Sequence, residues 1–240
     1  MTPKRIGILG GMGPEATVLL MQRVIAATPA RDDADHIPLL VDMNPQVPSR
    51  IARLIEGRGE DPGPVLAEMA RRLETGGATA LAMPCNTAHH YAPEIRAAVE
   101  VPFIDMVALS VARAAERLGP GGKLGLLGSP ALRRIGLFDR ACAEAGLTLL
   151  HPQDEDALLA AIRAIKAHGP DEDSRAALRA ASADLARRGA TLQLVACTEF
   201  SLIAGALAPE AEGIDTLDLL VAAIRDAALG APTQEDGTAA

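Results

Sequence analysis

The sequence predicts an α/β protein made of two similar halves, each built on a mostly parallel sheet. Short apolar runs alternate with longer amphipathic stretches, which is the pattern of strands joined by crossover helices. In addition, landmark segments of the first half recur in the second half in the same order. We therefore expect two α/β domains related by a pseudo-two-fold axis, with the functional site in the cleft between them.

The apolar runs have the length of strands and end at glycine, proline or polar residues. The expected strands cover residues 5–11, 38–43, 79–84, 101–106, 123–129, 147–152, 191–196 and 213–217. The stretches between them carry apolar residues at helical spacing. The expected helices cover residues 14–28, 64–76, 89–99, 107–118, 131–145, 154–167, 171–188 and 216–229.

Two segments fit neither pattern. Residues 44–64 carry four prolines and four glycine or serine residues, so we expect a long irregular loop. Long loops inside compact domains are more often functional than neutral. The polar segment from Gly230 onward, GAPTQEDGTAA, has the composition of a disordered tail.

The internal repeat is centred on two cysteines, Cys85 and Cys197, which are 112 positions apart. Three pairs of segments carry it: GATALAMPCNT (77–87) with GATLQLVACTE (189–199), RIGILGG (5–11) with KLGLLGS (123–129), and FID (103–105) with GID (213–215). Their offsets are 112, 118 and 110 positions. We expect a first domain of residues 1–105 plus 216–240 and a second of residues 106–215, with both cysteines facing one cleft.

Composition excludes several classes of protein. The chain has 23 basic and 31 acidic residues, a formal net charge of −8, and no basic run, so neither nucleic acid nor another polyanion is an expected partner. No apolar run approaches the roughly 18 residues of a membrane span, and the glycine-broken N-terminus is not a signal peptide. Three cysteines do not form a disulfide framework. These features predict a cytoplasmic protein without a membrane partner.

Each cysteine of the repeat follows an apolar strand and precedes an expected helix. A helix N-terminus favours a thiolate and lowers the pKa of a cysteine. Asn86, Thr87 and Thr198 add donors that could hold a carboxylate beside each sulfur. A single cysteine at a strand end is more often a small core residue. Two at matched positions of a repeat favour a functional pair.

The chain resembles the aspartate/glutamate racemase superfamily, and within it the aspartate racemase branch. The segments that carry the resemblance are IGILGGMGPEAT (6–17), NPQVPSR (44–50), GRGEDPGP (57–64), MPCNTAH (83–89) and ACTE (196–199). The resemblance implies racemisation without pyridoxal phosphate, another cofactor or a metal. It also implies that one cysteine thiolate removes the α-proton while the other cysteine delivers a proton to the opposite face.

Physical reasoning agrees with that mechanism, because racemisation needs a base and an acid on opposite faces of one carbon. Fixed donors must stabilise the negative charge on the α-carboxylate. Glutamate racemases, as the resemblance implies, carry an acidic-Ser-Gly opening after the first strand and a His after the second Cys-Thr. Here the opening is GGMGP (10–14), and Glu199 follows the second Cys-Thr. We therefore expect aspartate as the substrate, with glutamate as an alternative, and a homodimer as in many relatives.

An acidic amino acid needs a second anion site for its side chain. Arg50, in the irregular loop, is the candidate because its guanidinium binds carboxylates bidentately. The resemblance also implies that Lys166 contacts the distal carboxylate; a solvated lysine at a helix end is the competing interpretation. Glu199 could orient Cys197, bind the substrate ammonium, or only cap the following helix.

The remaining candidates are less specific. Met12 and the supporting Gly11 lie in the glycine-rich opening, and Ser129 lies in its counterpart in the second half. The resembling enzymes tend to be threonine-rich at this counterpart, so the departure GSPALRR weakens the prediction for Ser129. His89, four residues after Cys85, could tune the thiol or be a buried structural residue. Cys142, which has no motif, is expected to be a packed helix residue.

Three other interpretations remain. GMGPEA (11–16) satisfies a relaxed dinucleotide-binding fingerprint, with Asp42 as the ribose acid, although this explains neither the cysteines nor the loop. Cys85, His89 and His90 could belong to a thiol-based metal or redox site, which would also need Cys197. An inactive amino-acid-binding relative on the same fold is the third.

Overall fold

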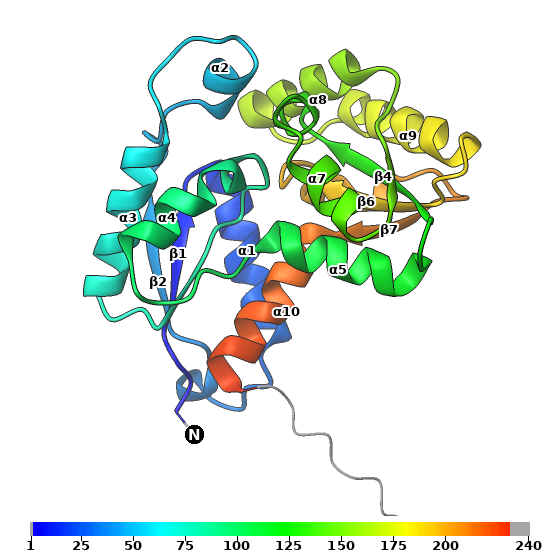
Figure 1. Ribbon diagram of the computed structural model, residues 1–240. Coiled ribbons are helices and arrows are strands. Elements are labelled where there is room, and N and C mark those ends of the chain that lie inside the picture. The colour runs from blue at the N-terminus through cyan, green and yellow to red at the C-terminus, as the bar shows by residue number, and fades with distance from the viewer. Residues whose placement is uncertain (1, 231–240) are drawn as a thin grey trace, which may run out of the picture.

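A computed structural model describes residues 2–230 and contains two parallel sheets (Figure 1). The first sheet has the order β2 (Leu39–Met43), β1 (Ile6–Gly10), β3 (Ala80–Ala82). The second has the order β5 (Thr148–Leu150), β4 (Lys123–Gly128), β6 (Leu192–Ala196), β7 (Glu212–Asp215). All strand pairs within them are parallel. The predicted fold class, with two mostly parallel α/β sheets, is confirmed.

Helices cover both faces of each sheet. Their bounds are α1 (Pro14–Ala27), α2 (Arg50–Leu54), α3 (Gly63–Thr75), α4 (Ala92–Ala98), α5 (Met106–Leu118), α6 (Pro130–Ile135), α7 (Leu137–Glu144), α8 (Glu155–His168), α9 (Glu172–Arg187) and α10 (Thr216–Leu229). On the first sheet, α3 and α4 bury their apolar side chains on one face, and α1 and α10 on the other. On the second sheet, α8 and α9 cover one face, and α5 and α7 the other.

Two of these helices carry the chain from one sheet to the other. Helix α5 follows the strands of the first sheet, yet Val107 and Val111 are buried against the second. Helix α10 follows β7 of the second sheet, yet Leu217 and Leu220 are buried against the first. The two helices, which we call the crossing helices, contact each other at the junction (Figure 1). The division of the chain at residues 105 and 215 stays a prediction.

The predicted strand 101–106 is wrong. This segment forms a single bridge, between Leu81 and Phe103. Pro102 has no N–H to donate, so the ladder cannot extend toward the start of the segment. At its other end the Asp105 side chain accepts hydrogen bonds from the N–H groups of Val107 and Ala108 and caps α5.

Three helix and loop predictions also need correction. The expected helix 131–145 is broken at Gly136, whose φ of 62° is left-handed and ends α6. The expected helix 89–99 begins as a 3₁₀ turn, Thr87–Tyr91, before α4. The loop predicted to be irregular contains the short helix α2, and the Ser49 side chain caps its N-terminus.

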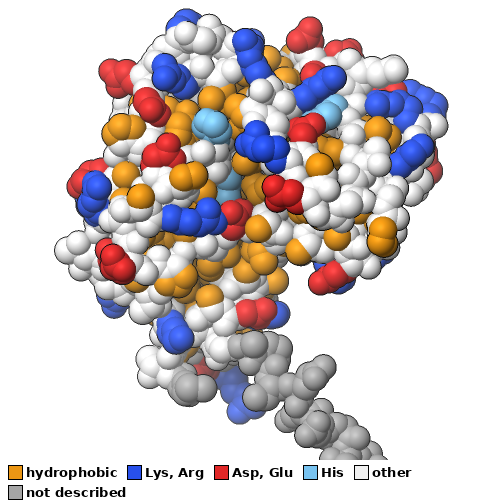
Figure 2. Space-filling view, in the orientation of Figure 1, with side chains coloured by type: hydrophobic (Ala, Val, Ile, Leu, Met, Phe, Trp, Pro, Cys, Tyr) orange, Lys and Arg blue, Asp and Glu red, His pale blue; other side chains and the backbone are white. Residues whose placement is uncertain are grey.

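The surface agrees with a chain of mixed charge. On the face in Figure 2, acidic and basic side chains are interspersed instead of gathered into one basic field. Across residues 2–230, no helix combines the length and the apolar character that crossing a membrane requires. The predicted disordered tail falls, from residue 231, outside the described residues.

The turn between β1 and α1 depends on Gly11. Its φ is 90°, and a Cβ at this position would lie 2.4 Å from the carbonyl carbon of Asn44. Gly11 also donates its N–H to Thr17 Oγ1 over 3.0 Å. The close approach brings the glycine-rich turn against Asn44, where the 44–64 segment begins, so any side chain here would push the two apart.

We expect Gly11→Ala to lower the free energy of unfolding by about 2 kcal/mol or more, because strain and overpacking act together. Gly57→Ala is the matched control, since Gly57 also has a positive φ, 66°, but open space around it. Urea unfolding of both variants measures the difference. Equal losses in the two variants would show that close packing at Gly11 is unimportant.

Candidate active site

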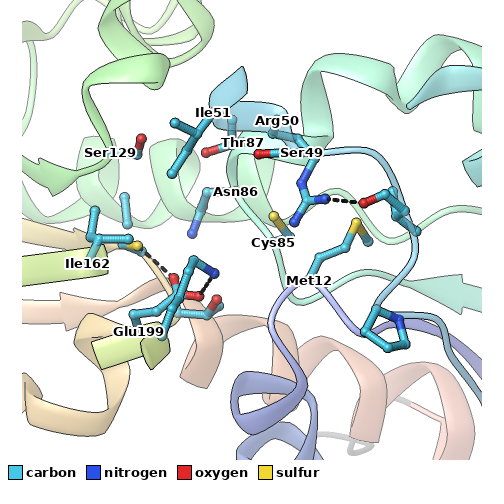
Figure 3. A pocket seen from close by; sticks show the side chains of 16 residues that line it. Met12, Ser49, Arg50, Ile51, Cys85, Asn86, Thr87, Ser129, Ile162 and Glu199 are labelled. Atoms are coloured by element: carbon cyan, nitrogen blue, oxygen red, sulfur yellow. Dashed lines mark hydrogen bonds and ion pairs between the residues drawn. The ribbon is translucent and has the colours of Figure 1, made fainter. Parts of the chain in front are cut away.

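A cavity of about 220 Å³ lies between the two domains at the carboxyl ends of β3, β4 and β6 (Figure 3). This volume is below the range of pockets for drug-sized ligands and suits a small molecule. Residues from both halves line it: Met12, Pro45, Val47, Ser49, Arg50, Ile51, Cys85, Asn86, Thr87, Ser129, Ile162, Lys166, Ala196, Cys197, Thr198 and Glu199.

Cys85 reaches the cavity directly after β3, and its backbone is fixed by His89. The Nδ1 atom of His89 donates to the Cys85 carbonyl oxygen over 2.9 Å, while Nε2 accepts the N–H of Met106 over 3.1 Å. Burial lowers the pKa of His89, in agreement with this neutral tautomer. His89 therefore ties the Cys85 segment to α5 and does not touch the thiol.

Cys197 follows β6 and makes a different set of contacts. Its Sγ donates to Glu199 Oε2 over 2.9 Å, and Glu199 Oε1 is paired with the Lys166 ammonium. Burial raises the pKa of Cys197 well above its ordinary value, and the charge and accepting oxygen of Glu199 raise it further. The expected lowering of this pKa is therefore wrong, because burial and Glu199 raise it. The expected helix after Cys197 is a 3₁₀ segment, Phe200–Ala206.

The residues four positions after the two cysteines have equivalent roles. His89 contacts the start of α5, as described, and Ser201 Oγ donates to Asp215 Oδ1 over 2.7 Å at the start of α10. Asp215 caps α10 through the N–H of Leu217. Each cysteine segment is thus attached to the N-terminus of one crossing helix, which places the two segments symmetrically.

Asn86 links the two halves beneath the cavity. Its Nδ2 donates to Thr216 Oγ1 over 3.0 Å, and Thr216 Oγ1 donates to the carbonyl oxygen of Val195 over 3.0 Å. The Oδ1 atom of Asn86 is buried and has no hydrogen-bond partner among the described residues. Asn86 lines the cavity, and its Oδ1 is a buried acceptor without a partner in the described part of the chain.

Two cationic side chains, Arg50 and Lys166, line the cavity, and they differ in their partners. The Arg50 guanidinium donates only to the carbonyl oxygens of Val47 and Pro48, and forms no ion pair among residues 2–230. Although burial acts to lower it, the pKa of Lys166 is raised by the adjacent Glu199 carboxylate. Arg50 is thus the cation that remains free to bind a new carboxylate.

The loop that carries Arg50 spans the cleft. Arg134 of α6 donates to the carbonyl oxygen of Ile55 over 2.6 Å, and Arg163 of α8 pairs with Glu56 at 3.0 Å. The loop belongs to the first half of the chain, whereas both arginines belong to the second. These contacts hold the Arg50 loop against the second half, and Figure 1 shows α2 at the edge of the first half that faces it.

Most of the candidates from the sequence line this cavity: Met12, Arg50, Cys85, Asn86, Thr87, Ser129, Lys166, Cys197, Thr198 and Glu199. His89 and Gly11 do not line it. Ser129 Oγ also accepts the N–H of Ala131 at the start of α6. Sequence reasoning missed Val47, Ile51 and Ile162, although Ile162 lies one helical turn before Lys166 and Ile51 directly follows Arg50.

The competing interpretations find little support. Asp42, the proposed ribose ligand of a dinucleotide site, is bound by Arg72 at 2.6 Å. Both ring nitrogens of His89 are occupied by main-chain groups. Within the described part of the chain, no three His, Cys, Asp or Glu side chains are grouped so that they could hold a metal ion.

The fold and the paired cysteines define an α/β enzyme in which each domain supplies one thiol to a shared cavity. Residues 9–227 match the sequence model of the Asp/Glu/Hydantoin racemase family. The chain belongs to this family and is by class an amino-acid racemase. The resemblance inferred from the motifs is therefore confirmed.

Particular relatives cover nearly the whole chain. A broad specificity amino-acid racemase of Bacillus subtilis (strain 168), RacX, is 26% identical over 216 residues, 88% of this chain and 92% of the relative. The Picrophilus torridus aspartate racemase structure is 28% identical, with a TM-score of 0.78 and 92% of each chain covered. A glutamate racemase of Bacillus anthracis, 18% identical, shares the fold with a TM-score of 0.67, over 93% of this chain and 81% of its own.

We expect Glu199→Gln to make Cys197 more reactive toward iodoacetamide. The change removes the negative charge and leaves Lys166 unneutralised, so the pKa of Cys197 falls and its thiolate forms at lower pH. Alkylation at pH 8 should be at least about tenfold faster, which corresponds to one pKa unit. Peptide mass spectrometry reports each cysteine separately.

Two cysteines serve as internal controls in that experiment. Burial raises the pKa of Cys142 to about 12, so it should remain unlabelled. An equal acceleration at Cys85 would instead indicate that the cleft has opened, and an unchanged rate at Cys197 would contradict the role assigned to Glu199.

Proposed function

We propose that this protein racemises an acidic amino acid, with aspartate as the principal substrate and glutamate as an alternative, by a two-thiol mechanism. The observation that carries the proposal is the convergence of Cys85 and Cys197, from two halves of the chain, on one small cavity. This cavity also holds Arg50, which forms no ion pair with the described residues. The chemistry uses only the side chains of the protein.

The charge of the cavity matches this substrate. Its charged lining residues are Arg50, Lys166 and Glu199, two cations and one carboxylate, which leave one net positive charge before either cysteine is ionised. An acidic amino acid carries two carboxylates and one ammonium, so it brings one net negative charge. In our assignment Arg50 binds the side-chain carboxylate bidentately, with Lys166 as a second contact.

The polar groups beside the two cysteines supply the remaining contacts. Thr87, Thr198 and Ser129 carry hydroxyls at the cavity wall, which can donate to the α-carboxylate. Donors fixed in place before the reaction stabilise the negative charge that develops on that carboxylate when the α-proton leaves. Asn86, which also lines the cavity, adds a side-chain amide to these groups.

The reaction moves two protons and no other atoms. In one direction the Cys85 thiolate removes the α-proton, and the Cys197 thiol donates its proton to the opposite face of the carbon. Cys85 then carries a proton and Cys197 is a thiolate, ready for the other enantiomer. Whenever Cys197 holds the proton, its thiol donates a hydrogen bond to Glu199 Oε2 over 2.9 Å.

The relatives support this choice of substrate. The Picrophilus torridus relative is an aspartate racemase, whereas RacX of Bacillus subtilis has broad specificity. Both kinds of activity agree with a small cavity lined by Arg50, a cation without an ion-pair partner among residues 2–230. Apolar side chains of Val47, Ile51 and Ile162 also line it and limit the length of the side chain that can bind.

We expect the wild-type protein to exchange the α-proton of L- and D-aspartate in D₂O, followed by NMR and chiral chromatography. Cys85→Ala and Cys197→Ala should each abolish racemisation, because each removes one member of the acid–base pair. Cys142→Ala is the matched control and should retain activity, since Cys142 is buried in α7 away from the cavity.

The outcomes separate the alternatives. Unchanged racemisation in either active-site variant would refute the two-thiol mechanism. Binding of aspartate without exchange in the wild-type protein would instead favour an inactive amino-acid-binding relative on the same fold.

We expect Arg50→Met to raise KM for aspartate about 10- to 100-fold, the loss of a charge-assisted contact of about 1.5–3 kcal/mol. The effect on kcat should be smaller if the guanidinium binds ground and transition states alike. Arg53→Met, an exposed arginine of the same helix α2, is the control and should leave KM unchanged. Equal KM values for Arg50→Met and wild type would refute the distal carboxylate site.

A further inference from the structure

We propose that Arg23 is a positioning residue for Cys197: it attaches the Cys197 segment, residues 197–201 of the second half, to helix α1 of the first half. The inference rests on the proposed function, in which Cys85 and Cys197 must face one carbon from opposite sides. Arg23 does not line the cavity, so it touches neither the substrate nor the reacting atoms. It acts only through the main chain that carries Cys197.

The Arg23 guanidinium divides its donors between two kinds of partner. Nη1 donates to Asp215 Oδ2 over 2.6 Å and to Asp218 Oδ1 over 2.8 Å, at the start of α10, which packs on α1 (Figure 1). Nη2 donates to the main-chain carbonyl oxygen of Ser201 over 2.9 Å, across 178 positions of the chain. The rigid fork of a guanidinium can hold both kinds of partner at once.

The contact reaches Cys197 through the main chain. The Cys197 carbonyl oxygen accepts the N–H of Phe200 over 2.8 Å and the N–H of Ser201 over 3.2 Å. The carbonyl of the same Ser201 is the group that Arg23 holds, and its hydroxyl donates to Asp215, the ion-pair partner of Arg23. One guanidinium and one carboxylate therefore fix the residue to which Cys197 is bonded.

The Cys197 segment benefits from this attachment because no regular helix continues it. Phe200–Ala206 is a 3₁₀ segment, and Ile203 within it has a non-helical φ of −130° and ψ of 23°. Short 3₁₀ segments have poorer hydrogen-bond geometry than α-helices. A tie to the neighbouring helix α1 therefore holds Cys197 more firmly than the 3₁₀ segment alone.

The equivalent arginine on the Cys85 side makes no such tie. Arg96 pairs with Asp105 at 2.6 Å, and both residues lie in the first half, nine positions apart. Among the described residues, the Arg96 side chain makes no hydrogen bond to the main chain around Cys85. Removal of Arg23 should therefore displace Cys197 and leave Cys85 in place.

The test compares Arg23→Met, which removes all three contacts, with Arg23→Lys, which keeps the charge but has a single nitrogen. We expect kcat for aspartate to fall about 10- to 100-fold in Arg23→Met and at least about tenfold in Arg23→Lys, because a displacement of about 1 Å at a reacting group costs this much. KM should stay within about threefold of wild type, since the Arg50 contact is unaltered.

The two enantiomers of 3-chloroaspartate report each thiol separately. When a thiolate removes the α-proton, the C–H electron pair forms a C=C bond and chloride leaves from the β-carbon, so no second thiol takes part. Cys197→Ala identifies the enantiomer that depends on Cys197. We expect Arg23→Met to slow elimination from that enantiomer at least about tenfold, and to leave elimination from the other within about threefold.

Arg72→Met is the matched control. Arg72 also binds a carboxylate through two nitrogens, with the shorter contact to Asp42 Oδ2 at 2.6 Å, and neither residue lines the cavity. This variant should leave kcat and both eliminations unchanged. Iodoacetamide labelling adds a readout that needs no turnover: in Arg23→Met, Cys197 should react at least about fivefold faster as its sulfur leaves Glu199, while Cys85 should not change.

Two results would overturn the assignment. One is wild-type kcat in Arg23→Met; the other is an equal loss of elimination from both enantiomers, which would indicate general damage to the fold. If Arg23→Met fails to fold, Arg23→Lys decides by the same measurements. Failure of the proposed function gives a different result: wild-type protein then turns over neither aspartate nor 3-chloroaspartate, while the labelling rate of Cys197 relative to Cys85 still decides the role of Arg23.

Discussion

The burial of two helix N-termini at the domain junction is the constraint on which the site depends. The first N–H groups of a helix have no partner within it, so a buried helix start needs caps. Asp105 and Asp215 supply them, and each carboxylate is in turn bound by an arginine, Arg96 and Arg23. The cysteine segments attach to these same helix starts. The contacts made at these two helix N-termini therefore also fix the positions of both thiols.

The internal symmetry of the chain is structural, whereas the chemistry on its two sides is unequal. Both cysteines are 8% exposed, follow a strand and precede a 3₁₀ segment. Cys197 has a carboxylate against its sulfur, while no side chain of residues 2–230 makes a hydrogen bond to Cys85 Sγ. The carboxylate is itself partly neutralised by Lys166. The repeat thus places two equivalent groups, and burial together with Glu199 raises the proton affinity of Cys197.

Hydrophobic periodicity and the internal repeat predicted the fold class and the meeting of both cysteines at one cavity. They could do so because strands and their ends have local sequence patterns. Local patterns do not report partners that are distant in the chain. The contact of Asn86 with Thr216 joins residues 130 positions apart and has no motif. The pKa of Cys197 is raised by burial and by the Glu199 carboxylate, which contacts the sulfur only in the folded chain. The expectation of a lowered pKa, which rested on a helix N-terminus, therefore had the wrong direction. At Gly136, one left-handed residue outweighed a continuous helical pattern.

The Glu199 contact has a kinetic consequence for the two-thiol mechanism. Between turnovers the free enzyme exists in two protonation forms, one ready for each enantiomer, and a carboxylate beside only one sulfur makes their populations unequal. Because enantiomers have equal free energies, the ratio kcat/KM must nevertheless be identical for L and D substrates. If unequal thiols make kcat differ between the L and D substrates, KM must therefore differ by the same factor. The asymmetry between the two thiols affects how the free enzyme interconverts between its two protonation forms. It cannot favour either enantiomer at equilibrium.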